Sequence, residues 1–260
     1  MKTSTCLLLL ASLAVSTSAR LGAQGESEIT HAPDGGIARH VEGIFVPAIP
    51  GAPFTTKEQV QLTNHLADGT VVAQKYYAMI VRDSQGRVYR ETRGRIPMGS
   101  DREPPITRFY VNDPKKGIRT TCYLATHTCE VSRWHGAVHL TDEPVGLSRD
   151  GLSYLTREEL GRSTTDGLDV IETRETRTFN AGAFGNDRAV AVTKRYWYSP
   201  QLQINLAVDR HDPRTEDQKL ELTELSLSEP DPAWFAIPQG FRLISPKDAT
   251  AAAVENGTVR

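Results

Sequence analysis

The feature that most constrains the fold is an alternation of apolar and polar residues that recurs between turn signals. Its clearest case is residues 202–209, where every second residue is apolar: Leu202, Ile204, Leu206 and Val208. Successive side chains of a β-strand point to opposite faces, so a period of two places these four side chains on one face. This segment therefore predicts a half-buried strand.

Turn residues separate several such runs. Asp68-Gly69 and the sequence "DSQG" at 83–86 divide three β-rich runs, and Asp113-Pro114 with Gly117 marks a further turn. The chain holds about nine or ten predicted strands and hardly any convincing helix. We therefore predict a mainly β fold in which residues 53–245 form a single large curved antiparallel sheet, an incomplete β-barrel.

One irregularity lies near the end of the predicted sheet. In "KLELTELSL" the apolar positions run Leu220 and Leu222, then shift by one residue to Leu225 and Leu227. A shift of one residue would turn the later leucines to the other face unless the strand bulges. The segment therefore predicts a β-bulge, which bends a strand and helps a sheet to curl.

The start of the chain fits a secretory signal peptide. Lys2 supplies a positive charge, residues 6–15 an apolar run, and Thr17-Ser18-Ala19 a small-residue cleavage signal. We expect residues 1–19 to be removed, with cleavage as late as residue 25 as the alternative. The apolar run is shorter than the roughly 20 residues of a spanning helix. The expectation is a periplasmic or secreted protein without a transmembrane anchor.

Other segments lack the strand pattern. Residues 26–52 are rich in Gly, Pro and Ala and predict an extended lead-in, of which "GIFVPAIP" is apolar enough to pack. Residues 136–156 predict a long surface connection of unknown role. Residues 246–260 predict a flexible tail. The net charge of −2 gives no indication of nucleic-acid binding, and we expect no nucleic-acid partner.

Three histidines, His127, His135 and His139, are the candidates for a metal site, and a metal-dependent hydrolase around them is one alternative function. The segment "HGAVH" lacks the glutamate and the helical setting of a metalloprotease motif. We favour surface histidines near loops and expect no metal and no cofactor.

Other catalytic patterns are equally weak. No G-x-S-x-G motif occurs. The acids of "IETRETRTF" are interleaved with Arg174 and Arg177, which predicts a solvated strand face with cross-strand charge pairs rather than a glycosidase pair. We assign no catalytic residue, and a protein without enzymatic activity is favoured over an enzyme.

Aromatic residues offer a different kind of site. They gather in "RYWYS" and "AWFAIPQGF", and in strands such residues usually belong to the core. On a concave sheet they can also line an apolar groove. The candidates for a ligand groove are Tyr196, Trp197, Tyr198, Trp234 and Phe235.

Two cysteines remain once Cys6 is removed with the signal peptide, and "CYLATHTC" places them seven positions apart. In a hairpin whose loop is residues 124–127, Cys122 faces Cys129 at a distance that a disulfide can bridge. Exported proteins keep disulfides. We predict a Cys122–Cys129 disulfide that contributes about 2.5 kcal/mol by restricting the unfolded chain.

Several blocks resemble known proteins. "RDSQGRVYRE", "YWYSPQLQINLAVDRHDPRT" and "LSLSEPDPAWFAIPQGFRL" look like an uncharacterised secreted acidobacterial protein family, over residues 43–244. The meander and the ending "DPAWFAIPQGF" are similar to the periplasmic lipoprotein-carrier (LolA-like) group. That resemblance implies a half-barrel whose concave face is closed by helices and holds acyl chains. The amphipathic helices of the carriers are not evident in this sequence.

These observations lead to an exported soluble binding module that holds a lipid, a lipoprotein or an apolar peptide in the concave face of a half-barrel. Its partners would be lipid or acylated protein. A non-catalytic envelope protein whose sheet edge pairs with a partner is the other alternative to the hydrolase. The sequence does not indicate the ligand or the oligomeric state.

Overall fold

The computed structural model describes residues 41–136 and 143–244. The predicted signal peptide at 1–19, the later cleavage position at 25, the first part of the lead-in and the tail at 246–260 lie outside the described residues. His139 lies outside them too.

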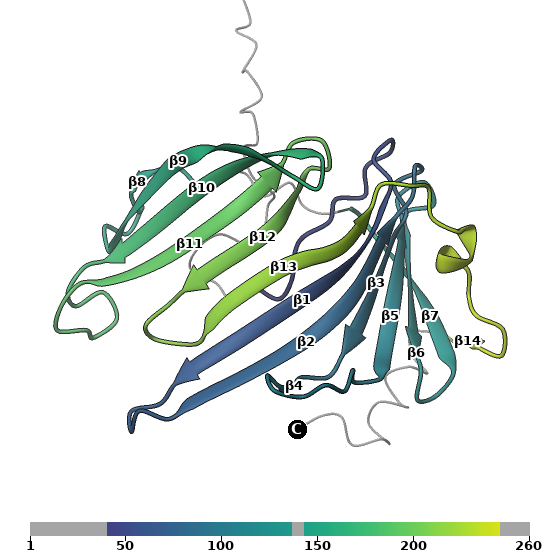
Figure 1. The fold of residues 1–260 in the computed structure, drawn as a ribbon, viewed down its shortest axis with the longest axis horizontal. Helices are drawn as coiled ribbons and strands as arrows, with labels where there is room; N and C mark the ends of the chain where they lie inside the picture. The colour runs from purple at the N-terminus through teal and green to yellow at the C-terminus, as the bar shows by residue number, and fades with distance from the viewer. Residues whose placement is uncertain (1–40, 137–142, 245–260) are drawn as a thin grey trace, which may run out of the picture.

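In these two described ranges, fourteen strands form one sheet, which is open and curved (Figure 1). The strands are β1 (Phe54–His65), β2 (Val71–Arg82), β3 (Val88–Arg93), β4 (Ile96–Pro97), β5 (Ile106–Asp113), β6 (Ile118–Tyr123), β7 (Thr128–Arg133), β8 (Gly146–Leu147), β9 (Ser153–Thr165), β10 (Leu168–Phe179), β11 (Val190–Ser199), β12 (Ile204–His211), β13 (Asp217–Ser226) and β14 (Arg242–Ile244). A short 3-10 helix, η1, covers Pro232–Phe235. The prediction of a single large curved antiparallel sheet is confirmed.

The strand order is β14-β7-β6-β5-β3-β2-β1-β13-β12-β11-β10-β9-β8, with β4 beside β2. Every neighbouring pair is antiparallel except β14 and β7, which are parallel. The sheet therefore consists of two meanders that run outward from the pair β1 and β13, in which Val60 lies opposite Leu220. Within the described residues no helix is long and apolar enough to cross a membrane.

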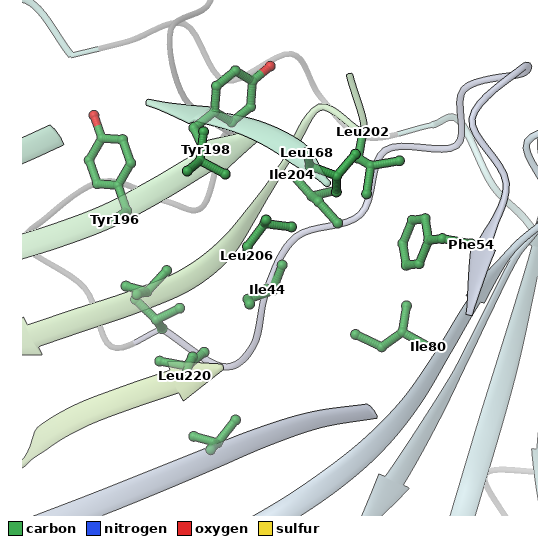
Figure 2. Packing of buried hydrophobic residues seen from close by; sticks show 14 of the residues in the cluster. Ile44, Phe54, Ile80, Leu168, Tyr196, Tyr198, Leu202, Ile204, Leu206 and Leu220 are labelled. Atoms are coloured by element: carbon green, nitrogen blue, oxygen red, sulfur yellow. The ribbon is translucent and has the colours of Figure 1, made fainter. Parts of the chain in front are cut away.

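The main core lies on the face of the sheet that carries Val60 and Leu220, and residues 41–53 of the lead-in run across it. We call this the lead-in face. Figure 2 shows Ile44 of the lead-in between side chains of β12 and β13 and those of Phe54 and Ile80. Ile44 is 1% exposed. The apolar lead-in is therefore packed, and it covers the centre of this face.

Buried polar side chains hold the backbone of the lead-in. The Gln218 side chain donates to the Val41 carbonyl and accepts from the Val41 N–H, both at 2.9 Å. Glu58 accepts from the Ile44 N–H at 2.5 Å, and Arg90 donates to the Ile44 carbonyl at 2.6 Å. Buried backbone groups need hydrogen-bond partners. These side chains supply to the lead-in the bonds that a neighbouring strand would otherwise make.

Arg90 also forms a buried ion pair with Glu58. Burial raises the pKa of Glu58, while the Arg90 guanidinium acts to lower it. A Cβ atom on Gly43 would lie 1.9 Å from Nη2 of Arg90. A glycine in the lead-in therefore leaves room for this ion pair.

Arg82 fixes the other end of the lead-in. Its guanidinium donates to the carbonyls of Ala52, Pro47 and Leu202 at 2.7, 3.1 and 2.9 Å. Burial lowers the pKa of Arg82 to about 10. One buried cation thus ties β2, the lead-in and the loop before β12 together.

A second cluster lies on the opposite face of β2, β3, β5, β6 and β7, and the segment after β13 covers it. The Trp234 ring of η1 lies 4.9 Å from the Tyr89 ring, and the Phe241 ring lies 6.4 Å from the Phe109 ring. The prediction contained neither this cover nor strands β4, β8 and β14.

The cysteines join the same cluster as a disulfide. Cys122 pairs with Cys129, and Tyr123 with Thr128, which is the predicted register. The hairpin is therefore clamped beside its turn.

Replacing Arg82 with lysine should lower the free energy of unfolding by about 3 kcal/mol, because one ammonium group cannot reach three buried carbonyls. Urea denaturation measures this change. Arg188→Lys, at a side chain that is 88% exposed, is the control and should be neutral. Equal stability of the two variants would contradict the account of the lead-in.

Replacing both Cys122 and Cys129 with serine should lower the free energy of unfolding by about 2.5 kcal/mol, since the unfolded chain then loses its cross-link. Guanidinium denaturation of the variant, compared with the wild type with and without reductant, measures this. A wild type that reductant does not destabilise would contradict the prediction.

Candidate functional site

The structure places the five aromatic candidates in three separate environments. Tyr196 and Tyr198 lie in the core of the lead-in face, at 0% and 6% exposure. Trp197 points to the opposite face of β11 and is half-buried. Trp234 and Phe235 pack on the second cluster. The five side chains do not line one surface.

The two described histidine candidates do not belong to a metal-binding group. His127 is exposed in the β6–β7 turn, where its ring lies 5.2 Å from the Phe241 ring, and His135 is exposed after β7. Among residues 41–136 and 143–244, no group of three His, Cys, Asp or Glu side chains is arranged to hold a metal ion.

The prediction of a solvated face for "IETRETRTF" is correct for one side of β10 only. Arg174 is exposed and donates to Glu158 at 2.6 Å, as expected for a cross-strand pair. Glu175 and Arg177 lie on the lead-in face and are 2% and 6% exposed. Arg157 donates to Glu175 at 2.7 Å, so this buried acid is paired within the structure.

Strands β12 and β13 are paired over only part of their length. Their ladder covers only four residues of each strand, from Arg210 opposite Gln218 to Ala207 opposite Glu221. Yet β12 begins at Ile204, and β13 continues to Ser226. The two strands diverge with distance from the hairpin that joins them (Figure 1).

Two β-bulges accompany this separation. Between β11 and β12 the register shifts from Trp197 opposite Ala207 to Tyr198 opposite Asn205, so Leu206 is an extra residue. A bulge bends its strand and redirects a side chain, often beside a functional site.

The second bulge lies in β13. The register with β1 shifts from Lys57 opposite Thr223 to Thr55 opposite Ser226, with Glu224 at a φ of 55°. This is the bulge that the shift in "KLELTELSL" predicted, and that prediction is confirmed. It lies beside Leu225.

The divergence leaves an open groove with a volume of about 470 Å³, within the range of about 300 to 1,000 Å³ for small-molecule sites. Both bulge regions contribute apolar side chains to it. The residues that line it are Thr165, Asp166, Arg195, Trp197, Leu206, Ala207, Asp209, Lys219, Glu221, Leu222, Thr223 and Leu225. We call this site the β12–β13 groove.

Charged side chains surround the apolar part of the groove. Arg195, Asp209 and Lys219 lie in one cross-strand row on β11, β12 and β13. Arg195 forms an ion pair with Glu172, and its guanidinium lies 4.7 Å from the Trp197 ring. The Lys219 ammonium lies 2.6 Å from the Glu221 carboxylate. The two cations are thus each bound to another acid.

Asp209 stands between these two ion pairs. Burial raises the pKa of Asp209, and the cations Lys219 and Arg195 only partly oppose this. Burial therefore disfavours the charged form of Asp209, and a further cation beside it would act against that effect.

The other end of the β12–β13 pair is locked. In the turn after β12, Asp212 accepts from Arg210 at 2.7 Å and from Nε and Nη2 of Arg214 at 2.8 Å. Burial acts to raise the pKa of Asp212, but the bonds from Arg214 outweigh it and hold the pKa at about 2. The strands are joined at this end, and they separate past Ala207 in the direction of Ile204.

No family model and no curated protein matches the chain. Among solved structures, an uncharacterized conserved protein from Thermus thermophilus has a TM-score of 0.36 at 11% identity, covering 73% of this chain and 90% of that one.

LprF from Mycobacterium bovis has a TM-score of 0.28 at 12% identity, covering 70% of this chain and 90% of that one. A LolA superfamily protein from Nitrosomonas europaea has a TM-score of 0.28 at 9% identity, covering 72% of this chain and 91% of that one. At these values the likeness assigns no function and no residue to this chain.

Replacing Asp212 with asparagine should lower the free energy of unfolding at pH 7 by about 2 kcal/mol, allowing for screening by solvent. A carboxyl whose pKa is depressed in the folded state stabilises above its unfolded pKa near 4. That contribution is lost as the pH falls toward about 2. Urea denaturation from pH 7 to pH 2 should therefore show the two proteins converging below about pH 4. A constant difference across this range would contradict the assignment.

Proposed function

We propose that this protein is an exported binding module that holds an extended apolar chain in the β12–β13 groove. The observation that carries the proposal is that two bulged strands separate and present leucines to an open groove. A sheet with a continuous ladder at this point would have no such opening.

The covering of the two main apolar clusters supports this choice. The lead-in covers the centre of its face, and the segment from η1 to Phe241 covers the second cluster. Both covers belong to the chain itself. In the β12–β13 groove, the leucines contact the core below and line open space above.

Export rests on the signal-peptide pattern of residues 1–19 and is supported by the disulfide, which persists in an oxidising compartment. The lipid, lipoprotein and apolar peptide that the sequence suggests share one element, a flexible apolar chain. A groove with an apolar floor and a charged rim suits such a chain.

The test uses Nile red, a neutral apolar dye, with the full mature chain. The wild type should bind the dye with a rise in fluorescence. Ala207→Phe, which fills the groove, and Leu225→Glu, which places a charge in it, should each weaken binding about tenfold or more.

Leu243→Glu, at an exposed leucine of β14, is the control and should bind as the wild type does. Circular dichroism melting shows whether each variant is folded, and Ala207→Phe decides the matter if Leu225→Glu is not. Equal binding by Ala207→Phe and the control would contradict the proposed site.

A further inference from the structure

We infer that the ligand of the β12–β13 groove is an extended basic peptide, which adds its backbone to the strand edges at the groove and places a lysine or arginine side chain beside Asp209. This rests on the proposed function, and it selects one ligand from the apolar chains that the groove could accept.

The backbone of the groove walls is the first reason. On their far sides both walls are paired along their length, since β12 follows β11 to Ile204 and β13 follows β1 to Ser226. On the sides that face each other, the ladder ends at Ala207 and Glu221. Strand edges present N–H and C=O groups, which a peptide can bond and an acyl chain cannot.

The spacing of apolar side chains is the second reason. In an extended peptide alternate side chains point to the same face, so every second residue can enter an apolar site. Leu206 and Leu222 come from opposite walls, and Leu225 lies farther along β13. An alternating apolar and polar peptide would place its apolar side chains on these leucines and its polar ones at the rim.

Charge is the third reason. The groove is lined by the acids Asp166, Asp209 and Glu221 and by the bases Arg195 and Lys219. Arg195 is bound by Glu172, an acid next to the groove, and Lys219 by Glu221. The carboxylates therefore exceed the cations, and Asp209 is the one in the centre of the cross-strand row.

Three peptides and one detergent separate the parts of the inference. The first peptide is acetyl-Val-Lys-Val-Lys-Val-Lys-Val-amide. The second replaces lysine with glutamate, and the third is the lysine peptide with N-methyl groups on alternate residues. Dodecyl maltoside below its micellar concentration supplies an acyl-type chain without charge. Each is tested for displacement of Nile red from the wild type.

The lysine peptide should displace the dye, and the other two peptides should do so at least about tenfold more weakly. Asp209→Asn should weaken the lysine peptide about tenfold, measured relative to the Nile red affinity of the same variant. Asp187→Asn is the matched control, at a side chain that is 92% exposed. It should have no effect.

The outcomes are distinguishable. If dodecyl maltoside displaces the dye and the lysine peptide does not, the inference is overturned while the proposed function stands. Equal affinity of the lysine and glutamate peptides, or of the lysine and N-methyl peptides, overturns it too. If Nile red binding does not depend on the groove, the proposed function fails and the inference fails with it.

Discussion

The pairing of β1 with β13 is the interaction on which the rest of the structure depends. These strands are far apart in the sequence, and their ladder joins two meanders whose other pairings are local, apart from the parallel pair of β14 with β7. Glu58 of β1 and Gln218 of β13 also hold the lead-in, so the same two strands carry the cover of the core. The bulge in this ladder is where β13 turns away from β12. The β1–β13 pairing thus joins the two halves of the sheet, and its bulge lies beside the groove.

The groove follows from two opposed constraints. Asp212 and its arginine partners hold the β12–β13 hairpin together at one end, while bulges at Leu206 and Glu224 bend the strands at the other. The lead-in and the segment after β13 cover the main faces of the sheet. Where β12 and β13 diverge, apolar side chains and strand edges lie together at an accessible surface. Its charges are arranged so that the cations of the rim have acidic partners and Asp209 lies between them. These features together favour a ligand with both an apolar surface and a positive charge.

Much of the fold could be predicted from local patterns. Turn residues and alternation give most of the strands and the hairpin register at Cys122, because each is decided by neighbours in the sequence. That the two meanders form one sheet depends instead on the distant pairing of β1 with β13. The bulge at Glu224 left a visible shift in the apolar positions. The bulge at Leu206 left none, since residues 202–209 alternate without interruption. The burial of Glu175 and Arg177 was missed for a related reason: a charged residue at an alternating position looks solvated until its partner on another strand is known. Trp197 is separated from Tyr196 and Tyr198 because adjacent residues of a strand point to opposite faces.

Whether ligand enters the β12–β13 groove or the lead-in face can be measured by amide chemical-shift mapping. Uniformly labelled protein would be titrated with Nile red to saturation. Binding in the β12–β13 groove should produce the largest changes at residues 204–207 and 221–225 and at the indole N–H of Trp197. Changes concentrated in residues 41–53 and around Tyr196 would show that the ligand displaces the lead-in instead, and would contradict binding in the groove.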